Sequence, residues 1–489
     1  MTDTAALRTA TSTDDLDAVL AAAAAAARVL ADSTPEQRAS WLRAAADALD
    51  ADADALVPLA QQETHLPVPR LTGELKRTTF QLRLFADEVE DGAFLHAVID
   101  HADPGWGMGP RPDLRRMQRP LGPVAVWAAS NFPFAFSTAG GDTASALAAG
   151  CPVVLVGHPG HPLLTRRTAS VLAAALLDAG APDGVFALVE GQEAGRALIQ
   201  DPRVAAGAFT GSLRGGRALF DLASAREVPI PFYGELGSVN PAFVTEGAAA
   251  ARPQEVAKGF AASMALGVGQ FCTKPGLLLV PEGSAIPSLV VQELAAAAGA
   301  PMLNDRIRSG YGDALRTMAG HEVVSVLAGT ADPDADPAPT LLRTSAAEVL
   351  ADPRPLTAEV FGPAALVVEY ADEEQLLDVA RVLEGQLTAT VQGDEEDAVV
   401  PPLLDLLSER AGRVLWNGWP TGVSVTYAQQ HGGPYPATTA VGTTSVGTAA
   451  IERFLRPVAY QDVPQSLLPE PLQDANPWGV PQRVDGVRS

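Results

Sequence analysis

Apolar residues in the first hundred positions recur at helical spacing. Ser12 can cap a helix that runs to about Leu30. Thr34, Pro35 and Gln37 stand in the order of an N-cap, a proline at the first helical position and a capping-box partner. Residues 71–89 continue the helical pattern, whereas proline, glycine and arginine interrupt residues 103–120. We therefore predict a helical start followed by an extended hairpin or a linker.

Beyond residue 123 the pattern changes to short apolar runs that alternate with helical stretches. The apolar runs lie at residues 124–129, 153–156, 185–189, 205–209 and 230–233, and helical spacing appears between them at 141–149, 165–179, 193–199 and 217–225. Strands joined by helices of this length pair in parallel with right-handed crossovers. We therefore expect a doubly wound α/β sheet, which binds ligands at the carboxyl ends of its strands. A second α/β segment follows at about 238–454, and the proline-rich tail is expected to be extended.

Composition narrows the class of protein. The chain has 489 residues, 47% of them hydrophobic, which predicts a globular protein of two or three domains. No apolar run approaches the ~20 residues that cross a bilayer, and the first residues lack the order of a signal peptide. The formal net charge of −24 argues against nucleic acid or an anionic membrane as a partner. Two cysteines make no disulfide framework, which fits a reducing cytoplasm.

Three residues could carry catalytic chemistry. Cys272 stands in the polar, turn-rich run GQFCTKPG, where a thiolate could be exposed and reactive, whereas Cys151 begins a buried strand. Glu235 lies between a strand end and a glycine turn, and burial there would raise its pKa, which suits a general base. Asn131 ends a strand, where its amide could donate to an oxyanion or simply shape a turn.

A candidate phosphate site is less obvious. No Gly-x-Gly-x-x-Gly motif follows a strand, but residues 209–216 join a predicted strand to a helix. Gly211 would permit close approach of the backbone, and the helix N-terminus offers amides and a dipole to a pyrophosphate. His158 and His161 lie close in sequence, but no carboxylate pattern accompanies them. We therefore expect no metal site.

Taken in order, several segments resemble motifs of the aldehyde dehydrogenase superfamily, and the likeness covers nearly the whole chain. They are NFP at 131–133, AFTGS at 208–212, ELG at 235–237, GQFC at 269–272 and EVFGP at 359–363. The resemblance implies that Cys272 is the nucleophile, Glu235 the general base and Asn131 the oxyanion-hole amide. It also implies a cofactor-binding set in which Glu359 holds the nicotinamide ribose and Ser212 contacts the pyrophosphate; the other members are Gly211, Gly216, Phe361, Val156 and His158.

The same resemblance implies an architecture and an activity. The fold class is α/β, with a Rossmann-type parallel-sheet cofactor domain at 1–101 and 121–237, an α/β catalytic domain at 238–455, and a small β oligomerisation flap at 102–120 and 456–489. The implied activity is NAD(P)-dependent oxidation of an aldehyde to the carboxylic acid through a cysteine thiohemiacetal and thioester. The implied cofactor is NADP or NAD. The implied assembly is a cytoplasmic homodimer or homotetramer.

Further segments resemble the branch of α-ketoglutaric semialdehyde (2,5-dioxopentanoate) dehydrogenases, which also contains NADP-dependent enzymes. They are HGGPYPATT at 431–439 and TSVGTAAIERF at 444–454. The candidate substrate is therefore 2,5-dioxopentanoate or a related semialdehyde. Three departures from the family pattern leave substrate and cofactor preference open. Val156 stands where a lysine usually binds the adenosine ribose. Lys274 stands where an asparagine is usual, and AVG at 440–442 stands where the branch usually has Asp-small-Arg.

Two alternatives to this dehydrogenase stay open. The first is a divergent homologue with weakened cofactor binding that uses the Cys272 thiol non-oxidatively. The second is a non-catalytic protein that retains the fold. Titration with NAD and NADP would separate them, because a dehydrogenase must bind one of the two.

Overall fold

The computed structural model describes residues 10–333 and 336–488, so the first nine residues of the expected cofactor domain lie outside the described residues. Its strands form three sheets. The first sheet has the order β5-β4-β3-β6-β7, and all its pairs are parallel. Its strands are β3 (Val124–Trp127), β4 (Val153–Val156), β5 (Phe186–Val189), β6 (Ala206–Thr210) and β7 (Phe232–Glu235). The helices between them are α5 (Gly141–Ala149), α6 (Pro162–Asp178), α7 (Gln192–Gln200) and α8 (Leu213–Ser224), which confirms the predicted doubly wound pattern.

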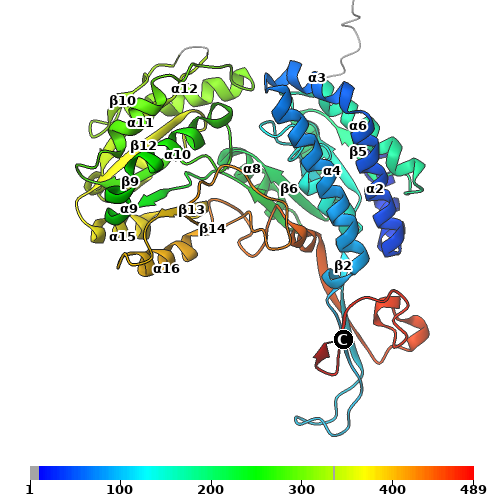
Figure 1. Ribbon diagram of the computed structural model, residues 1–489. Coiled ribbons are helices and arrows are strands. Elements are labelled where there is room, and N and C mark those ends of the chain that lie inside the picture. Colours follow the sequence, from blue (N-terminus) through cyan, green and yellow to red (C-terminus); the bar gives the residue numbers. More distant parts are fainter. Residues whose placement is uncertain (1–9, 334–335, 489) are drawn as a thin grey trace, which may run out of the picture.

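Four helices precede this sheet and pack against it. They are α1 (Thr13–Ala31), α2 (Pro35–Ala51), α3 (Ala53–Thr64) and α4 (Val68–Asp91), followed by the short 3₁₀ helix η2 (Ala93–Leu95). The predicted capping box is present, because Thr34 accepts the Gln37 N–H and the Gln37 side chain accepts the Thr34 N–H. Figure 1 shows α2, α4 and α6 grouped on one side of the molecule. Their apolar faces share one core with the strands β3 and β4.

The second sheet has seven strands in the order β10-β11-β12-β9-β8-β13-β14. They are β8 (Ala242–Val244), β9 (Leu277–Pro281), β10 (Ser325–Ala328), β11 (Thr340–Ser345), β12 (Ala364–Tyr370), β13 (Gln386–Gln392) and β14 (Ala411–Trp416). Only the edge strand β10 pairs antiparallel. Because side chains alternate along a strand, Leu278 and Leu279 of β9 enter separate cores on opposite faces.

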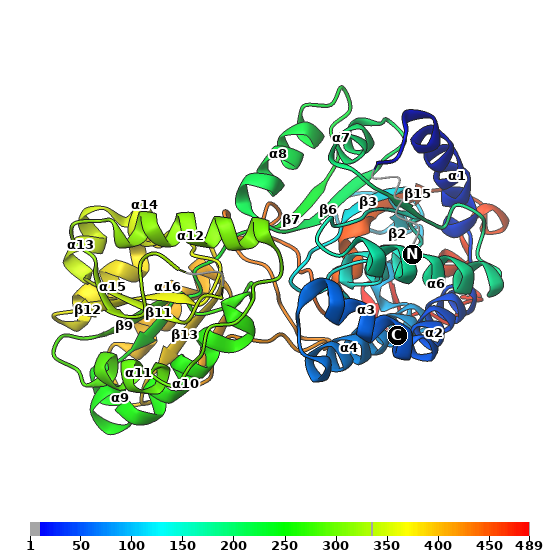
Figure 2. The ribbon, with the colours of Figure 1, turned by 90° about the horizontal axis from the view of Figure 1, so that it is seen from above.

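Helices cover both faces of this second sheet, as Figure 2 shows. One face carries α9 (Glu246–Ala251), α10 (Pro253–Ala265) and α11 (Ile286–Leu294). The other carries α12 (Asp305–Ala319), α13 (Ala346–Ala351), α14 (Pro353–Leu356), α15 (Glu373–Val382) and α16 (Val400–Arg410). The short 3₁₀ helix η3 (Leu266–Gly269) leads from α10 toward β9, and the loop between them holds Cys272. None of the described helices is long and apolar enough to span a membrane.

The third sheet is small and projects from the rest of the molecule (Figure 1), in the order β15-β2-β1-β16-β17. Its strands are β1 (Ala97–Asp100), β2 (Leu114–Pro120), β15 (Leu455–Gln461), β16 (Gln482–Val484) and β17 (Val487–Arg488). The 3₁₀ helices η4 (Thr448–Phe454), η5 (Gln465–Leu467) and η6 (Glu470–Leu472) flank β15. The sheet includes residues 97–100, so the expected cofactor-domain boundary at residue 101 is too late in the chain. The tail is not merely extended, because its end forms a β-hairpin that pairs with β1.

One segment joins the first two units of the fold at the end of β7. Residues 437–439 run antiparallel beside that strand, with Leu236 N–H donating to Ala437 O and Thr439 N–H donating to Gly234 O. This segment follows β14 in the chain, so it returns from the second unit to cover the edge of the first sheet. Glu235, the last residue of β7, therefore lies where the two units meet.

Candidate active site

Three side chains with chemically active groups converge at this junction. The Cys272 Sγ lies 3.6 Å from the His431 Nε2, which lies 3.0 Å from the Glu235 Oε1. One ligand atom from each of the three residues lies within 4.8 Å of the others. Sequence reasoning proposed Cys272 and Glu235, and the fold brings them together. Sequence reasoning missed His431 as a functional residue. The one indication of its role was that it begins the motif HGGPYPATT at 431–439, which resembles the α-ketoglutaric semialdehyde dehydrogenase branch.

Glu235 is buried and has two side-chain partners. Its Oε1 meets the His431 ring, and its Oε2 accepts a 2.6 Å hydrogen bond from the Ser445 hydroxyl. Burial acts to raise the pKa of Glu235, but the His431 ring and the Ser445 hydroxyl outweigh it, and the pKa is lowered. Our expectation of a raised pKa is therefore wrong. The carboxylate is held in its ionised form, and Ser445 is a second residue that sequence reasoning missed.

Cys272 is partly exposed, but its thiol is not an activated thiolate in this structure. Burial, and then the negative charge of Glu235, raise its pKa well above the usual range. The thiol therefore keeps its proton until a base removes it, and the His431 ring and the Glu235 carboxylate both lie beside it. Cys151 is fully buried, its thiol donates to Phe454 O, and burial raises its pKa to about 11.

The loop that carries Cys272 has an unusual backbone. Gly267, Val268 and Gly269 all have positive φ, at 58°, 58° and 64°. A Cβ at Gly269 would lie 2.2 Å from Gly362 O, so only glycine fits at that position. The Gln270 side chain accepts the Leu303 N–H at 3.0 Å and donates to Gly267 O at 3.1 Å. These contacts hold the backbone immediately before the nucleophile.

Asn131 lies beside this loop, in the turn that follows β3. Its Nδ2 donates to Gln270 O at 3.2 Å, and its backbone carbonyl accepts a hydrogen bond from the Arg70 Nη2 at 2.7 Å. The buried Glu74 carboxylate accepts two backbone N–H groups of the same turn. An amide nitrogen has a second hydrogen to donate. In the described chain the Cys272 N–H donates to no backbone carbonyl, so two donors are available near the thiol.

The phosphate-binding candidates lie at the carboxyl end of β6. Ser212 is the N-cap of α8, where its hydroxyl accepts the Gly215 N–H at 3.3 Å. Gly211 and Ser212 are exposed, so the start of α8 is open to a ligand. A Cβ at Gly216 would lie 2.1 Å from the Leu236 side chain, which explains the glycine. An exposed helix N-terminus with a glycine turn suits a pyrophosphate.

The two residues expected at the adenosine end of the cofactor, Val156 and His158, are both uncharged in the structure. Val156 ends β4 as expected, but its side chain is only 7% exposed, and a Cβ at Gly195 of α7 would lie 3.4 Å from it. The His158 Nδ1 accepts the Gly160 N–H at 2.9 Å. Burial lowers the pKa of His158 to about 3, so its ring is neutral. Neither Val156 nor His158 therefore offers a cation.

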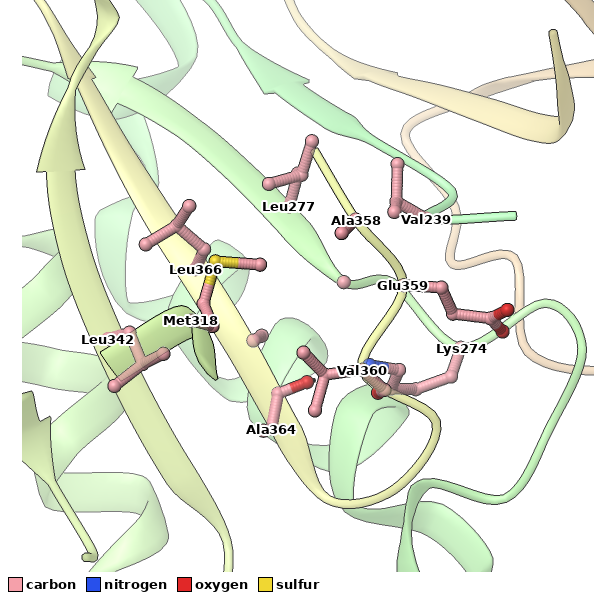
Figure 3. Close-up of a pocket in the computed structure, with 12 residues that line it drawn as sticks. Val239, Lys274, Leu277, Met318, Leu342, Ala358, Glu359, Val360, Ala364 and Leu366 are labelled. Carbon is pink, nitrogen blue, oxygen red and sulfur yellow. Dashed lines mark hydrogen bonds between the residues drawn. The ribbon is translucent and has the colours of Figure 1, made fainter. Parts of the chain in front are cut away.

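Glu359 and Lys274 lie on two segments that meet beside a small cavity, shown in Figure 3. The Lys274 Nζ donates to Val360 O at 2.9 Å and to Ala364 O at 2.6 Å, while the Glu359 carboxylate points away from that ammonium group. Burial lowers the pKa of Lys274 to about 8. Burial also raises the pKa of Glu359 to about 7, although the charge of Lys274 acts to lower it. Lys274 therefore ties the nucleophile loop to the segment that contains Glu359 and Phe361.

The α/β fold has three units, and a cysteine, a carboxylate and an asparagine lie at the junction of its sheets. This is the arrangement that the resemblance to aldehyde dehydrogenases predicts. Residues 2–457 match the model of the aldehyde dehydrogenase family. The chain belongs to this family, and it is an aldehyde dehydrogenase, an enzyme that oxidises an aldehyde.

Within the family, two curated relatives indicate the branch. The chain is 48% identical over 459 residues to α-ketoglutaric semialdehyde dehydrogenase 2 of Azospirillum brasilense, covering 92% of this chain and 87% of that protein. It is 43% identical over 480 residues to α-ketoglutaric semialdehyde dehydrogenase of Acinetobacter baylyi, covering 97% and 91%. Among solved structures, 1-pyrroline-5-carboxylate dehydrogenase from Thermus with bound NAD has a TM-score of 0.77 at 20% identity, covering 93% of this chain and 86% of that one.

Proposed function

We propose that the enzyme works through a covalent thioester on Cys272, with Glu235 as its proton acceptor and His431 as the donor that holds the Glu235 carboxylate. The observation that carries this proposal is the contiguous contact from the Cys272 Sγ through the His431 Nε2 to the Glu235 Oε1. A thiol whose pKa is raised needs a neighbouring base, and a carboxylate whose pKa is lowered is ready to accept a proton.

The residues then act in a definite order. As the Cys272 proton passes to Glu235, Sγ attacks the aldehyde carbonyl and forms a thiohemiacetal. The Asn131 amide and the Cys272 N–H stabilise the oxyanion. A nicotinamide cofactor, when bound, would supply the hydride acceptor for this adduct, which would leave a thioester on Cys272. Once Glu235 has passed the first proton to solvent, it deprotonates a water that hydrolyses the thioester to the carboxylic acid.

The substrate proposed is an aldehyde that carries a carboxylate, 2,5-dioxopentanoate or a related semialdehyde. The names of the two curated relatives suggest it, and nearby cations support it. Two arginines, Arg77 and Arg413, interact electrostatically with Cys272. Burial lowers the pKa of both. Glu74 and then Cys272 act to raise the pKa of Arg77, and Cys272 acts to raise that of Arg413. In the described chain the Nη1 of Arg77 is buried without a hydrogen-bond partner. A substrate carboxylate would satisfy that donor.

The cofactor proposed is NAD or NADP, with little discrimination between them. The start of α8 would receive the pyrophosphate through Ser212, Gly211 and Gly216, and Glu359, beside Phe361, would hold the nicotinamide ribose. At the adenosine end, Val156 and His158 offer no cation for a 2′-phosphate. The neighbouring Pro159 offers no carboxylate to repel one. The first sheet serves as the cofactor domain, the second as the catalytic domain, and the projecting sheet as the contact between copies in a homodimer or homotetramer.

The test follows reduced nicotinamide with 2,5-dioxopentanoate and with pentanal, each with NAD and with NADP. We expect Cys272→Ala to abolish oxidation and to retain cofactor binding, because that variant lacks only the nucleophile. The matched control Cys151→Ala should keep wild-type rates, since that thiol lies outside the site. Most of the activity surviving in Cys272→Ala would disprove the covalent route. A thiol adduct without reduced nicotinamide would favour the non-oxidative alternative, and equal kcat/KM for the two aldehydes would exclude a carboxylate subsite.

A further inference from the structure

The cluster at the junction is also a set of metal donors. Cys272, His431 and Glu235 offer one sulfur, one imidazole nitrogen and one carboxylate oxygen, all within 4.8 Å of one another. Zn²⁺ prefers these three donor types and binds three protein ligands in sites that keep an open position. We infer that the three residues form a reversible Zn²⁺ site whose occupation blocks the nucleophile. This inference is independent of the proposed substrate and cofactor, and it revises our sequence-based expectation that the protein has no metal site.

Two of the donor-atom separations lie close to those around a tetrahedral ion. With Zn–S of about 2.3 Å and Zn–N of about 2.05 Å, tetrahedral angles place sulfur and nitrogen about 3.6 Å apart. The Cys272 Sγ and the His431 Nε2 are 3.6 Å apart. The same geometry places nitrogen and oxygen about 3.4 Å apart. The His431 Nε2 and the Glu235 Oε1 are 3.0 Å apart, so that pair would open by a few tenths of an ångström.

The surroundings of the donors favour binding that is reversible. The Ser445 hydroxyl holds the other oxygen of Glu235, which leaves Oε1 facing the cluster. Metal-binding histidines usually donate their second N–H to a carboxylate or a carbonyl. The His431 Nδ1 is buried and has no partner among residues 10–333 and 336–488, so this support is missing. Cys272 is partly exposed, so an ion can reach the cluster from solvent.

Binding would need no oxidant or reductant. The Cys272 thiol releases its proton to solvent, the His431 ring moves its proton from Nε2 to the unpartnered Nδ1, and the sulfur lone pair forms the bond to Zn²⁺ with no change of oxidation state. The thiolate and the Glu235 carboxylate together balance the two charges of the ion. The same lone pair can no longer attack a carbonyl, so the ion and the aldehyde exclude each other.

The experiment uses the full chain, freed of metal with a chelator, without aldehyde or cofactor. Titration with Co²⁺ should produce a thiolate-to-cobalt absorption band at one ion per chain, and Zn²⁺ should displace it. The band should be absent in Cys272→Ser and present in the matched control Cys151→Ala. His431→Asn and Glu235→Gln should each weaken Zn²⁺ by about 100-fold or more, because even outer-shell partners contribute 10- to 100-fold.

A second readout uses alkylation of Cys272 by iodoacetamide, which Zn²⁺ should slow in the wild type and not in His431→Ala. Thermal unfolding of each variant shows whether it is folded. Wild-type Zn²⁺ affinity in folded His431→Asn would overturn the three-donor site, as would the absence of a cobalt band in the wild type. Because no substrate or cofactor is present, these outcomes do not depend on whether the proposed oxidation is correct.

Discussion

Replacing His431 with alanine should move the pH dependence of thioester hydrolysis. Burial acts to raise the pKa of Glu235, and the His431 ring and the Ser445 hydroxyl together reverse this effect. Without His431, the Glu235 Oε1 loses its partner at 3.0 Å, and only the bond to Oε2 remains. The pKa of Glu235 should therefore rise. Because the ionised form is the base and is lost as pH falls, hydrolysis should fail at a higher pH than in the wild type.

The size of this change follows from the lost contact. A hydrogen bond to a charged group contributes about 1.5–3 kcal/mol, and one pKa unit corresponds to about 1.4 kcal/mol. The acid limb of the hydrolysis profile should thus move upward by about 1 to 2 pH units. The assay measures the hydrolysis rate constant from pH 4 to 9, about the range in which a carboxylate and an imidazole titrate, after a single-turnover burst of reduced cofactor.

Ser445→Ala serves as the matched variant, since it removes the 2.6 Å bond to the other oxygen of the same carboxylate and should move the limb in the same direction. An acid limb that stays in place in His431→Ala would show that His431 does not hold Glu235 in its ionised form. A fall in the burst alone, with hydrolysis unchanged, would assign His431 to the thiol and not to the carboxylate.

Three further variants test the remaining parts of the site. Glu235→Gln should keep a burst of reduced cofactor, because hydride transfer needs no activated water and the partly exposed Cys272 thiol can release its proton to solvent, and should then turn over slowly; equal loss of both phases would contradict this division of roles. Asn131→Ala should lower kcat by roughly 10²–10³, the usual effect of one oxyanion donor, and an unchanged kcat would remove it from the oxyanion hole. Lys274→Asn should raise the Kd for NAD, measured by fluorescence, because it removes the bonds to two carbonyls beside Glu359; an unchanged Kd would show that this tether does not position the ribose contact.

Local patterns predicted the elements of the fold more completely than they predicted the site. The capping box at Thr34 and the alternation of strands and helices depend on neighbouring residues, so the sequence shows them directly. His431 lies 159 positions beyond Cys272, in a segment with neither strand nor helix periodicity, and only the tertiary fold brings the two together. The direction of the Glu235 pKa change could not be foreseen for the same reason, since burial was predictable and the partners were not. Val156 was placed correctly at a strand end, but its packing against α7 was not apparent.

The pairing of β2 with β15 has a consequence for how the chain is made. Leu114–Pro120 pairs antiparallel with Leu455–Gln461, so β2 emerges from the ribosome long before its partner strand exists. Pairings this distant in sequence form slowly, because a very long loop must close first. Until then β2 is an open strand edge, which in other proteins invites association with a second chain. Arg115, Arg116 and Arg119 supply the charge that discourages such contacts, so this strand carries its own protection while the rest of the protein is synthesised.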